Sequence, residues 1–147
     1  MTQMKMNALV LAAVAGFAFL SVIPTRADQG DAHHEHFVKC AKACADCQVS
    51  CDSCFQHCAT LVAKGKPEHV KTMNVCVDCA EYCALAAKLS ARQSLFSATA
   101  CDGCAKACDE CAKECEKFKD EKRMSDCAKS CRDCAKSCRT MIEHLKH

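Results

Sequence analysis

Cysteine is the residue most able to do chemistry in this sequence, and its spacing is regular. Eighteen of the 147 residues are cysteines, and they fall into four blocks. Within each block the cysteines are alternately three and four residues apart, a spacing that places side chains on one stripe of an α-helix. Thiolates bind soft metal ions and carry redox chemistry, so this chemistry is expected along helices. The blocks are Cys40, Cys44, Cys47, Cys51, Cys54 and Cys58; Cys76, Cys79 and Cys83; Cys101, Cys104, Cys108, Cys111 and Cys115; and Cys127, Cys131, Cys134 and Cys138.

Disulfide formation is the first of three chemistries that so many thiols could serve. Side chains one helical turn apart have Cβ atoms about 5–6 Å apart, whereas a disulfide requires about 3.5–4.5 Å. Disulfides within one helix are therefore strained, while disulfides between helices stay open. Disulfide scaffolds of small exported domains are rich in loops, but no cysteine lies in an expected loop of this chain.

Binding of Cu(I) ions is the second chemistry, and it suits thiols at this spacing. Two sulfurs that hold one ion linearly lie about 4.6 Å apart if the bond resembles the roughly 2.3 Å of zinc–thiolate, and a helical pair reaches this with small rotamer changes. Thiolates that bridge two Cu(I) ions give a nearly neutral core, whereas each Cys₄ zinc site leaves surplus negative charge to bury. We therefore predict multiple Cu(I) ions per chain, with zinc- or cadmium-thiolate storage as an alternative.

A thiol–disulfide redox protein is the alternative from another functional class. Cys44-x-x-Cys47 is one of six Cys-x-x-Cys pairs in the sequence. Redox enzymes use one such pair at a helix N-terminus, where the dipole lowers the thiol pKa. Here the pairs lie in helix interiors, so a protein that is not an enzyme is expected.

Capping and turn residues between the cysteine blocks divide the chain into four expected helices. Asp31 can cap the first helix, Gly65 suits the position after its C-terminus, and Pro67 suits the first turn of the next helix. Ser90 and Gln93 have the spacing of a capping box, which predicts that the third helix begins near them. The helices are expected at about 31–64, 67–90, 94–118 and 122–144.

An internal repeat indicates that these helices turn the same face to a common centre. The segment 40–47 recurs in near copies at 104–111 and 127–134. Short links between amphipathic helices favour antiparallel neighbours. We therefore predict an all-α fold, an antiparallel up-down-up-down four-helix bundle with a cysteine-lined core and the charged residues outside.

Methionine and histidine residues extend the thiol stripes at both ends of the expected bundle. Imidazole and thioether bind Cu(I) more weakly than thiolate, a property that suits an entrance. The alternative is that the methionines close the core and the histidines are solvated, as expected for His34 and His144. Antiparallel packing places His33, His36, Phe37, Ser90, Ser97, Met141 and Leu145 at one end, and Leu61, His69, Met73, Phe118 and Met124 at the other. The candidate ligands besides the cysteines are His36, Met73, Met124 and Met141.

The N-terminal segment has the pattern of a secretory signal peptide. An uncharged apolar run from Ala8 to Ile23 follows Lys5, and small residues precede a cleavage site after Ala27. We predict a signal peptide at 1–27 and one metal-binding domain at 28–147 in the periplasm. The run is shorter than the roughly 20 residues of a spanning helix, so no membrane attachment is expected after cleavage. The 20 Lys+Arg interleave with 18 Asp+Glu, so no nucleic-acid partner is expected.

The Cys-x-x-x-Cys-x-x-Cys stripes on four consecutive helices resemble those of the bacterial four-helix-bundle copper storage proteins, the Csp family. The resemblance covers about residues 31–147. It implies a core that holds many Cu(I) ions through all eighteen cysteines, with methionine and histidine at a mouth. It also implies a homo-oligomer, a tetramer by family pattern. The expected partners of such a protein are copper ions and a copper-requiring client protein or a copper chaperone. We predict an exported, non-enzymatic Cu(I) storage or sequestration protein.

Overall fold

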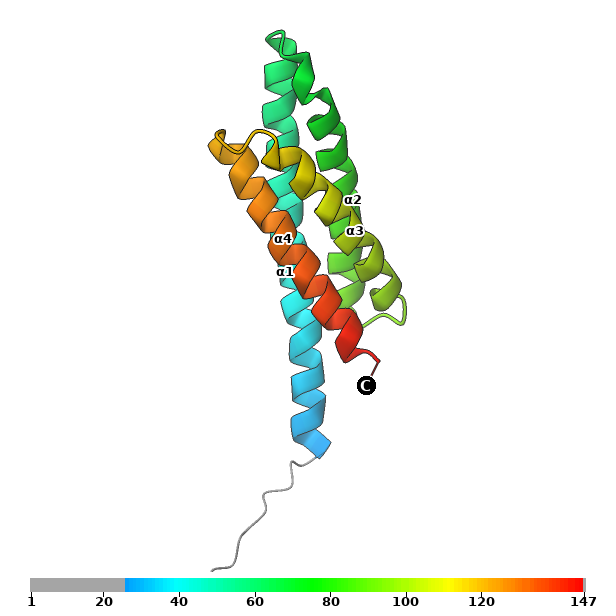
Figure 1. Ribbon diagram of the computed structural model, residues 1–147. Helices are drawn as coiled ribbons and strands as arrows, with labels where there is room; N and C mark the ends of the chain where they lie inside the picture. The colour runs from blue at the N-terminus through cyan, green and yellow to red at the C-terminus, as the bar shows by residue number, and fades with distance from the viewer. Residues whose placement is uncertain (1–25, 147) are drawn as a thin grey trace, which may run out of the picture.

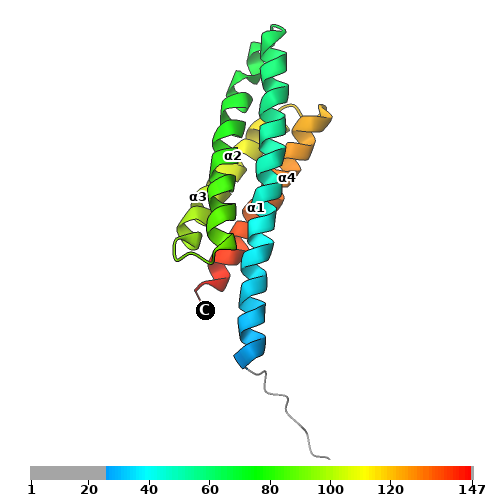
Figure 2. The ribbon, with the colours of Figure 1, turned by 180° about the vertical axis from the view of Figure 1, so that it is seen from behind.

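Four antiparallel α-helices form a bundle of two helical hairpins, which Figure 1 shows from one side and Figure 2 from behind. The computed structural model describes the backbone of residues 26–146 and the side chains of residues 33–146. Most of the predicted signal peptide lies outside this range. The up-down-up-down bundle is confirmed, with these elements in chain order: α1 (Arg26–Ala63), the 3₁₀ turn η1 (Pro67–His69), α2 (Val70–Ala91), α3 (Ser97–Glu116) and α4 (Lys122–His144).

The first helix is the longest and projects beyond the others at its N-terminal end (Figure 1). It has 38 residues, which corresponds to about 57 Å. Its start at Arg26 corrects the prediction that Asp31 caps the helix. A capping residue favours a helix start but does not stop the preceding backbone from being helical. In the described part of the chain, no helix combines the length and the apolar character needed to cross a membrane.

The turn after α1 has the conformation that its sequence predicts. Gly65 has a φ of 83°, a left-handed value that glycine adopts without strain. Its N–H donates to the Val62 carbonyl at 2.9 Å, and the Lys66 N–H donates to the Leu61 carbonyl at 3.1 Å. These two bonds are those of a Schellman motif. Pro67 then begins η1, so both predictions for this turn are confirmed.

The turn between α2 and α3 differs from its prediction. Gln93 has a left-handed φ of 51° and occupies the same position after α2 that Gly65 occupies after α1. The capping-box prediction is wrong, because Ser90 is buried in the last turn of α2 and α3 begins only at Ser97. The Gln93 side chain bonds to Nδ1 of His34 on α1 at 2.7 Å. This tertiary contact helps to offset the cost of the unusual backbone conformation.

Thiols and alanines fill the core of the bundle. All eighteen cysteines are at most 1% exposed. Small flanking residues let the helices approach closely, and in the described chain the large apolar side chains that are buried are Phe37, Met124 and Met141. They lie near the ends of the cysteine stripes. The buried alanines are Ala80, Ala86, Ala100, Ala105, Ala112, Ala128 and Ala135.

Among the residues whose side chains are described, the Asp, Glu, Lys and Arg side chains lie on the outside as predicted, with one exception. Ion pairs one helical turn apart, such as Lys129–Asp133 at 2.6 Å, are exposed and of a kind that contributes about 0.3–0.5 kcal/mol. Glu114 is instead 6% exposed. It accepts hydrogen bonds from Lys117 at 2.6 Å and from Lys71 of α2 at 2.7 Å, and these bonds lower its pKa. Glu114 therefore ties α3 to α2 through charge.

Candidate metal centre

The cysteine side chains form a single column of sulfur atoms along the bundle, which we call the thiol column. Every cysteine in it is a free, buried thiol. The shortest Sγ–Sγ distances cross between helices, as in the 3.5 Å between Cys44 of α1 and Cys138 of α4. Contacts within one helix are at the long end of the range, such as the 4.0 Å between Cys47 and Cys51. Cysteines from different helices therefore approach one another more closely than cysteines of the same helix.

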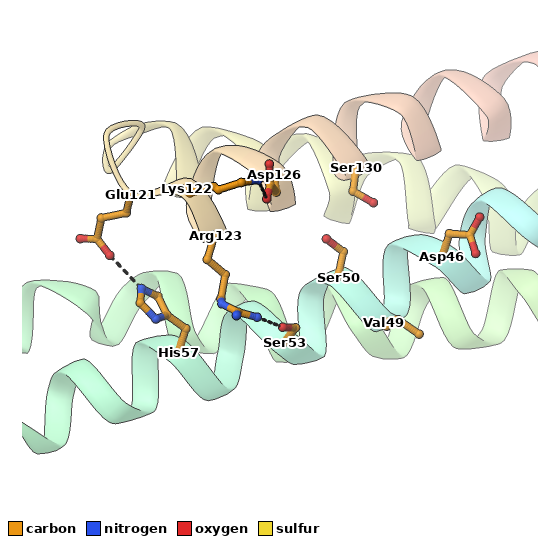
Figure 3. A pocket seen from close by; sticks show the side chains of 10 residues that line it. All are labelled: Asp46, Val49, Ser50, Ser53, His57, Glu121, Lys122, Arg123, Asp126 and Ser130. Carbon is orange, nitrogen blue, oxygen red and sulfur yellow. Dashed lines mark hydrogen bonds and ion pairs between the residues drawn. The ribbon is translucent and has the colours of Figure 1, made fainter.

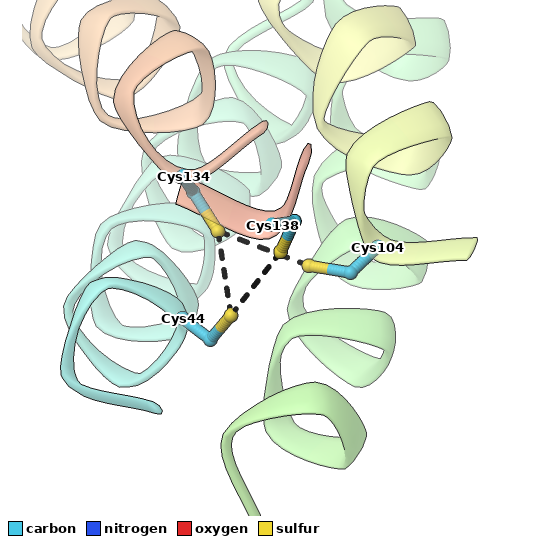
Figure 4. Close-up of side chains that lie close together, drawn as sticks. All are labelled: Cys44, Cys104, Cys134 and Cys138. Atoms are coloured by element: carbon cyan, nitrogen blue, oxygen red, sulfur yellow. Dashed lines mark hydrogen bonds between the residues drawn. The ribbon is translucent and has the colours of Figure 1, made fainter. Parts of the chain in front are cut away.

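Sets of four cysteines, which we call quartets, bring their sulfurs within 4.8 Å of one another. Figure 4 shows one quartet, in which Cys44 of α1 faces Cys104 of α3 and two residues of α4, Cys134 and Cys138. Within it, Cys134 lies 3.7 Å from Cys44 and 3.8 Å from Cys104. Other quartets are Cys47, Cys51, Cys79 and Cys131; Cys47, Cys83, Cys108 and Cys134; Cys51, Cys111, Cys127 and Cys131; and Cys54, Cys76, Cys115 and Cys127.

Neighbouring quartets have members in common. Cys134 belongs to a quartet with Cys44 and to another with Cys83, and Cys127 belongs to one with Cys111 and to another with Cys54. If each quartet held its own metal ion, some cysteines would have to bind two ions at once. The column is therefore suited to thiolates that bridge from one metal ion to the next.

The sulfur spacing fits soft metals with three or four ligands. For a metal–sulfur bond of about 2.3 Å, the sulfurs lie about 4.0 Å apart around a trigonal ion and about 3.8 Å apart around a tetrahedral one. Contacts of 3.5 Å (Cys44–Cys138) to 4.0 Å (Cys127–Cys51) bracket these values. Linear binding needs sulfurs about 4.6 Å apart, which is wider than these contacts. The sulfur–sulfur distances are thus compatible with both Cu(I) and Zn(II), and the sharing of cysteines between quartets favours Cu(I).

Hydrogen bonds between thiols set where protons are held along the column. The contact with Cys111 raises the pKa of the Cys76 thiol well above its ordinary value. Cys58 shows the opposite shift, because hydrogen bonds from Cys54 and then Cys76 lower its pKa to about 4. Buried thiolates side by side repel one another. Metal ions must therefore displace thiol protons as they bind, and their positive charge replaces that of the protons.

One end of the column, which we call the histidine end, carries imidazoles from α1 and α4. His33 Nδ1 lies 2.7 Å from His144 Nε2. The His36 ring stacks on the His144 ring with centroids 4.0 Å apart. Met141, one turn before His144, is 1% exposed. His144 was expected on the surface but is half-buried in this group.

The other end, which we call the Glu121 end, is organised around a carboxylate. His57 of α1 bonds to Glu121 at 2.9 Å and His69 of η1 bonds to it at 3.1 Å. These bonds, that of His57 first, lower the pKa of Glu121. The His69 ring is 2% exposed and stacks on Phe118 with centroids 4.2 Å apart. One carboxylate thus links α1, η1 and the turn before α4.

The sequence-predicted methionine and histidine ligands differ in how closely they approach the thiols. Met124 is fully buried, and its Sδ accepts a hydrogen bond from the Cys54 thiol at 3.4 Å. Met141 is buried with the core, while Met73 is half-buried and packs against it. His36 is half-buried among the histidines of its end. Of these four residues, Met124 is the one that forms a hydrogen bond with a thiol in the described chain.

Polar residues continue the α2 stripe at both ends: Ser90 and His69 were predicted at the two ends of the bundle, whereas Thr72 was not predicted. Ser90 lies one heptad after the last cysteine of α2, and its Oγ is 3.7 Å from Cys101 Sγ. Thr72 and His69 precede the first cysteine of α2 by four and seven residues. Thr72 Oγ1 and His69 Nδ1 are buried without a hydrogen-bond partner in the described chain. Counting one helical turn back from Cys76 would have found Thr72 as well.

A polar groove of about 900 Å³ lies between α1 and α4, outside the thiol column (Figure 3). Arg123 donates a hydrogen bond to Ser53 across it, and His57 reaches from α1 to Glu121 at one end. None of the residues that line it is a cysteine. The groove is therefore a surface feature and separate from the metal centre.

Comparison with known proteins gives one family match and several structural neighbours. The sequence model described as copper storage protein, Csp, matches residues 32–143. The Cu(I)-bound copper storage protein BsCsp3 of Bacillus subtilis is 35% identical, covers 70% of this chain and 94% of its own, and has a TM-score of 0.64. A protein from Nitrosospira multiformis is 31% identical, with coverages of 74% and 96% and a TM-score of 0.64.

A more distant neighbour shares the fold. It is a cytosolic copper storage protein from Streptomyces lividans, described with five coppers. It is 23% identical, with coverages of 78% and 98% and a TM-score of 0.70. No curated protein sequence matches this chain.

Proposed function

Because the chain belongs to the copper storage protein family, we propose that it holds many Cu(I) ions as cargo within its thiol column. The observation that carries this proposal is the sharing of cysteines between neighbouring quartets. Bridging thiolates let the number of ions approach the number of sulfurs while the buried charge stays near zero. The proposed ligands are all eighteen cysteines, with His36, Met73, Met124 and Met141 as weaker ligands at the ends.

Anaerobic titration of the reduced protein with Cu(I) against a competing chelator tests the proposal. We expect saturation at many ions per chain, because the column is continuous. Replacing two mid-column thiols, Cys51→Ala with Cys108→Ala, is expected to lower the capacity while initial uptake stays similar. Saturation at about one or two ions per chain would contradict storage. Full displacement of Cu(I) by equimolar Zn(II) would favour the zinc alternative.

Redox activity as an enzyme is less well supported than storage. A thiol–disulfide oxidoreductase exposes an attacking thiolate to its substrate, whereas the cysteines here are at most 1% exposed. We therefore propose a binding protein without catalytic turnover. Reduction of insulin disulfides at rates well above those of free thiol would overturn this part of the proposal.

Export to the periplasm is the cellular setting that we propose from residues 1–27. The support is the apolar run after Lys5 and the small residues before the site at Ala27. Cleavage there would remove the first two residues of α1. The Streptomyces lividans neighbour is described as cytosolic, so family membership does not decide the compartment. Cell fractionation and N-terminal sequencing of the purified protein test export, with an intact Met1 in the cytosol as the contrary result.

Assembly and copper traffic complete the proposal. We propose a homo-oligomer, a tetramer by family pattern, that exchanges copper with a client protein or a copper chaperone. Light scattering during size-exclusion chromatography measures the assembly, and a monomeric mass at micromolar concentration would contradict it. Transfer of copper to an added Cu(I)-requiring protein tests the exchange.

A further inference from the structure

Three imidazoles from two helices gather at the histidine end. His33 and His36 lie one turn apart on α1, and His144 lies in the last turn of α4. The His33 Nδ1 to His144 Nε2 distance is 2.7 Å, their ring centroids are 4.8 Å apart, and the His36 and His144 centroids are 4.0 Å apart. His144 is thus in contact with both histidines of α1.

The packing below these rings restrains their orientation. Phe37 is 3% exposed and meets the His33 ring edge-on, with centroids 5.1 Å apart. Because Phe37 is fixed in the core, one side of the His33 ring is held from within the bundle. His36 stacks on the other partner, His144, at an interplanar angle of 19°. The group is therefore formed by tertiary packing of α1 against α4 and is more than a chance neighbourhood on one helix.

The contact between His33 and His144 is one that a metal ion can replace. Two imidazole nitrogens at 2.7 Å share one proton, because one ring must donate and the other accept. Two nitrogens bound to one ion at about 2.0–2.1 Å lie about 2.8–3.4 Å apart for right-angled to tetrahedral geometry. Replacing the hydrogen bond by an ion thus requires that the donor ring move its proton to its other nitrogen, a change of tautomer, and that one ring shift outward by a small distance.

The donor atoms define the kind of ion. Neutral imidazole nitrogen favours borderline divalent ions such as Cu(II), Ni(II) and Zn(II), whereas the thiol column favours soft Cu(I). We propose that His33 and His144 form a separate site for one borderline divalent cation, with the His36 ring stacked against His144, distinct from the sulfur-bound cargo. The site goes beyond the proposed storage of Cu(I), because it concerns another oxidation class of ion and other donor atoms. Its occupancy does not depend on whether the column is filled.

Ni(II) is a suitable probe, since it does not oxidise thiols as Cu(II) does and since sulfur ligation gives intense charge-transfer absorption. The reduced protein, metal-free and Cu(I)-loaded, is titrated with nickel sulfate by calorimetry under nitrogen, and the bound Ni(II) is examined by X-ray absorption. We expect about one Ni(II) per chain with a nitrogen and oxygen shell in both samples. His144→Ala should weaken binding by about tenfold or more, and His33→Ala with His144→Ala should abolish it.

His34→Ala is the matched control. His34 is on the same helix but its Nδ1 bonds to the Gln93 side chain, so its loss should change Ni(II) affinity by less than about twofold. Circular dichroism of each variant establishes that the bundle is intact. Equal affinity in wild type and in the His33/His144 double variant, or a sulfur shell around the bound Ni(II), would overturn the proposal. If the column takes up no Cu(I) but Ni(II) still binds through nitrogen, the storage proposal fails and the histidine site stands.

Discussion

The two ends of the bundle carry the same kinds of side chain in different arrangements. At the Glu121 end, His57 and His69 both bond to one carboxylate, and His69 is buried against Phe118. At the histidine end, the imidazoles contact one another, and His33 is exposed. A histidine bonded to a fixed carboxylate is held in place, whereas two imidazoles that share a hydrogen bond can bind a cation between them once the donor ring changes tautomer. The difference suggests that one end fixes the structure and the other exchanges ions.

Truncating the methionine that closes each end should produce the largest change. Met124 is 0% exposed and Met141 is 1% exposed, so Met→Ala at either site leaves a cavity that costs about 2–5 kcal/mol of unfolding free energy. Urea unfolding of the metal-free reduced protein measures this loss. Met→Leu, which conserves volume, is the control and should cost less than about 1.5 kcal/mol. A loss below about 0.5 kcal/mol for either alanine variant would show that its end is not packed as described.

Removing one histidine from each end tests the comparison directly. His69→Ala should lower the unfolding free energy by about 1–3 kcal/mol, because it leaves Glu121 with one fewer hydrogen bond and removes a buried ring. His144→Ala should lower it by no more than about 0.5 kcal/mol, because its ring is only half-buried. Both values come from denaturant unfolding of the metal-free protein. Equal losses at the two ends would remove the distinction between them.

Copper kinetics sharpen the same comparison without altering the packing. His36→Ala with Met141→Leu removes the weak ligands of the histidine end and keeps the volume of the core. We expect Cu(I) loading to slow by roughly two- to tenfold, equivalent to about 1 kcal/mol in the barrier, with unchanged capacity. Met124→Leu at the Glu121 end should leave the rate unchanged. Stopped-flow uptake from a chelator measures both, and equal rates for all three proteins would argue that ions do not enter past His36.

Acid should weaken the Glu121 end in a graded manner, and this is the smallest effect. The pKa of Glu121 lies below its ordinary value of 4.5, because His57 and then His69 bond to the carboxylate. Its contribution to stability is therefore complete above about pH 4.5 and is lost as the pH falls through the folded-state pKa. Glu121→Gln should flatten the decline in unfolding free energy below this pH. The histidine-end variant His144→Ala should keep the slope of the wild type.

The parts of the fold that follow one periodic signal were predictable from the sequence. The heptad spacing of the cysteines determined both the helices and the column, since every cysteine on a stripe has to face the same axis. Gly65 and Pro67 determined the first turn, because each residue permits few backbone conformations. The same spacing placed Ser90 and His69 at the bundle ends, and it also applies to Thr72, which was not predicted from the sequence.

Features that depend on tertiary contacts were not predictable in this way. The left-handed Gln93 has no local signal, and its conformation goes with a contact to His34, which is 59 residues away. Glu114 was expected outside with the other charged residues between the cysteines, yet Lys71 and Lys117 bond to it and it is buried. Which cysteines contact one another across the column also depends on the tilt of the helices. The spacing of cysteines along one helix gives no information on this tilt.

A core of eighteen identical side chains has a consequence for how the chain finds its native alignment. Sliding one helix along its neighbour by a heptad would place thiol against thiol again, so the column itself hardly distinguishes one register from another. Varied side chains perform this selection in ordinary bundles. Here the selection falls to the few features that occur once, such as Glu121 between two histidines, Glu114 between two lysines, and a methionine at each end. Uniformity in the centre thus makes the ends responsible for a single native structure.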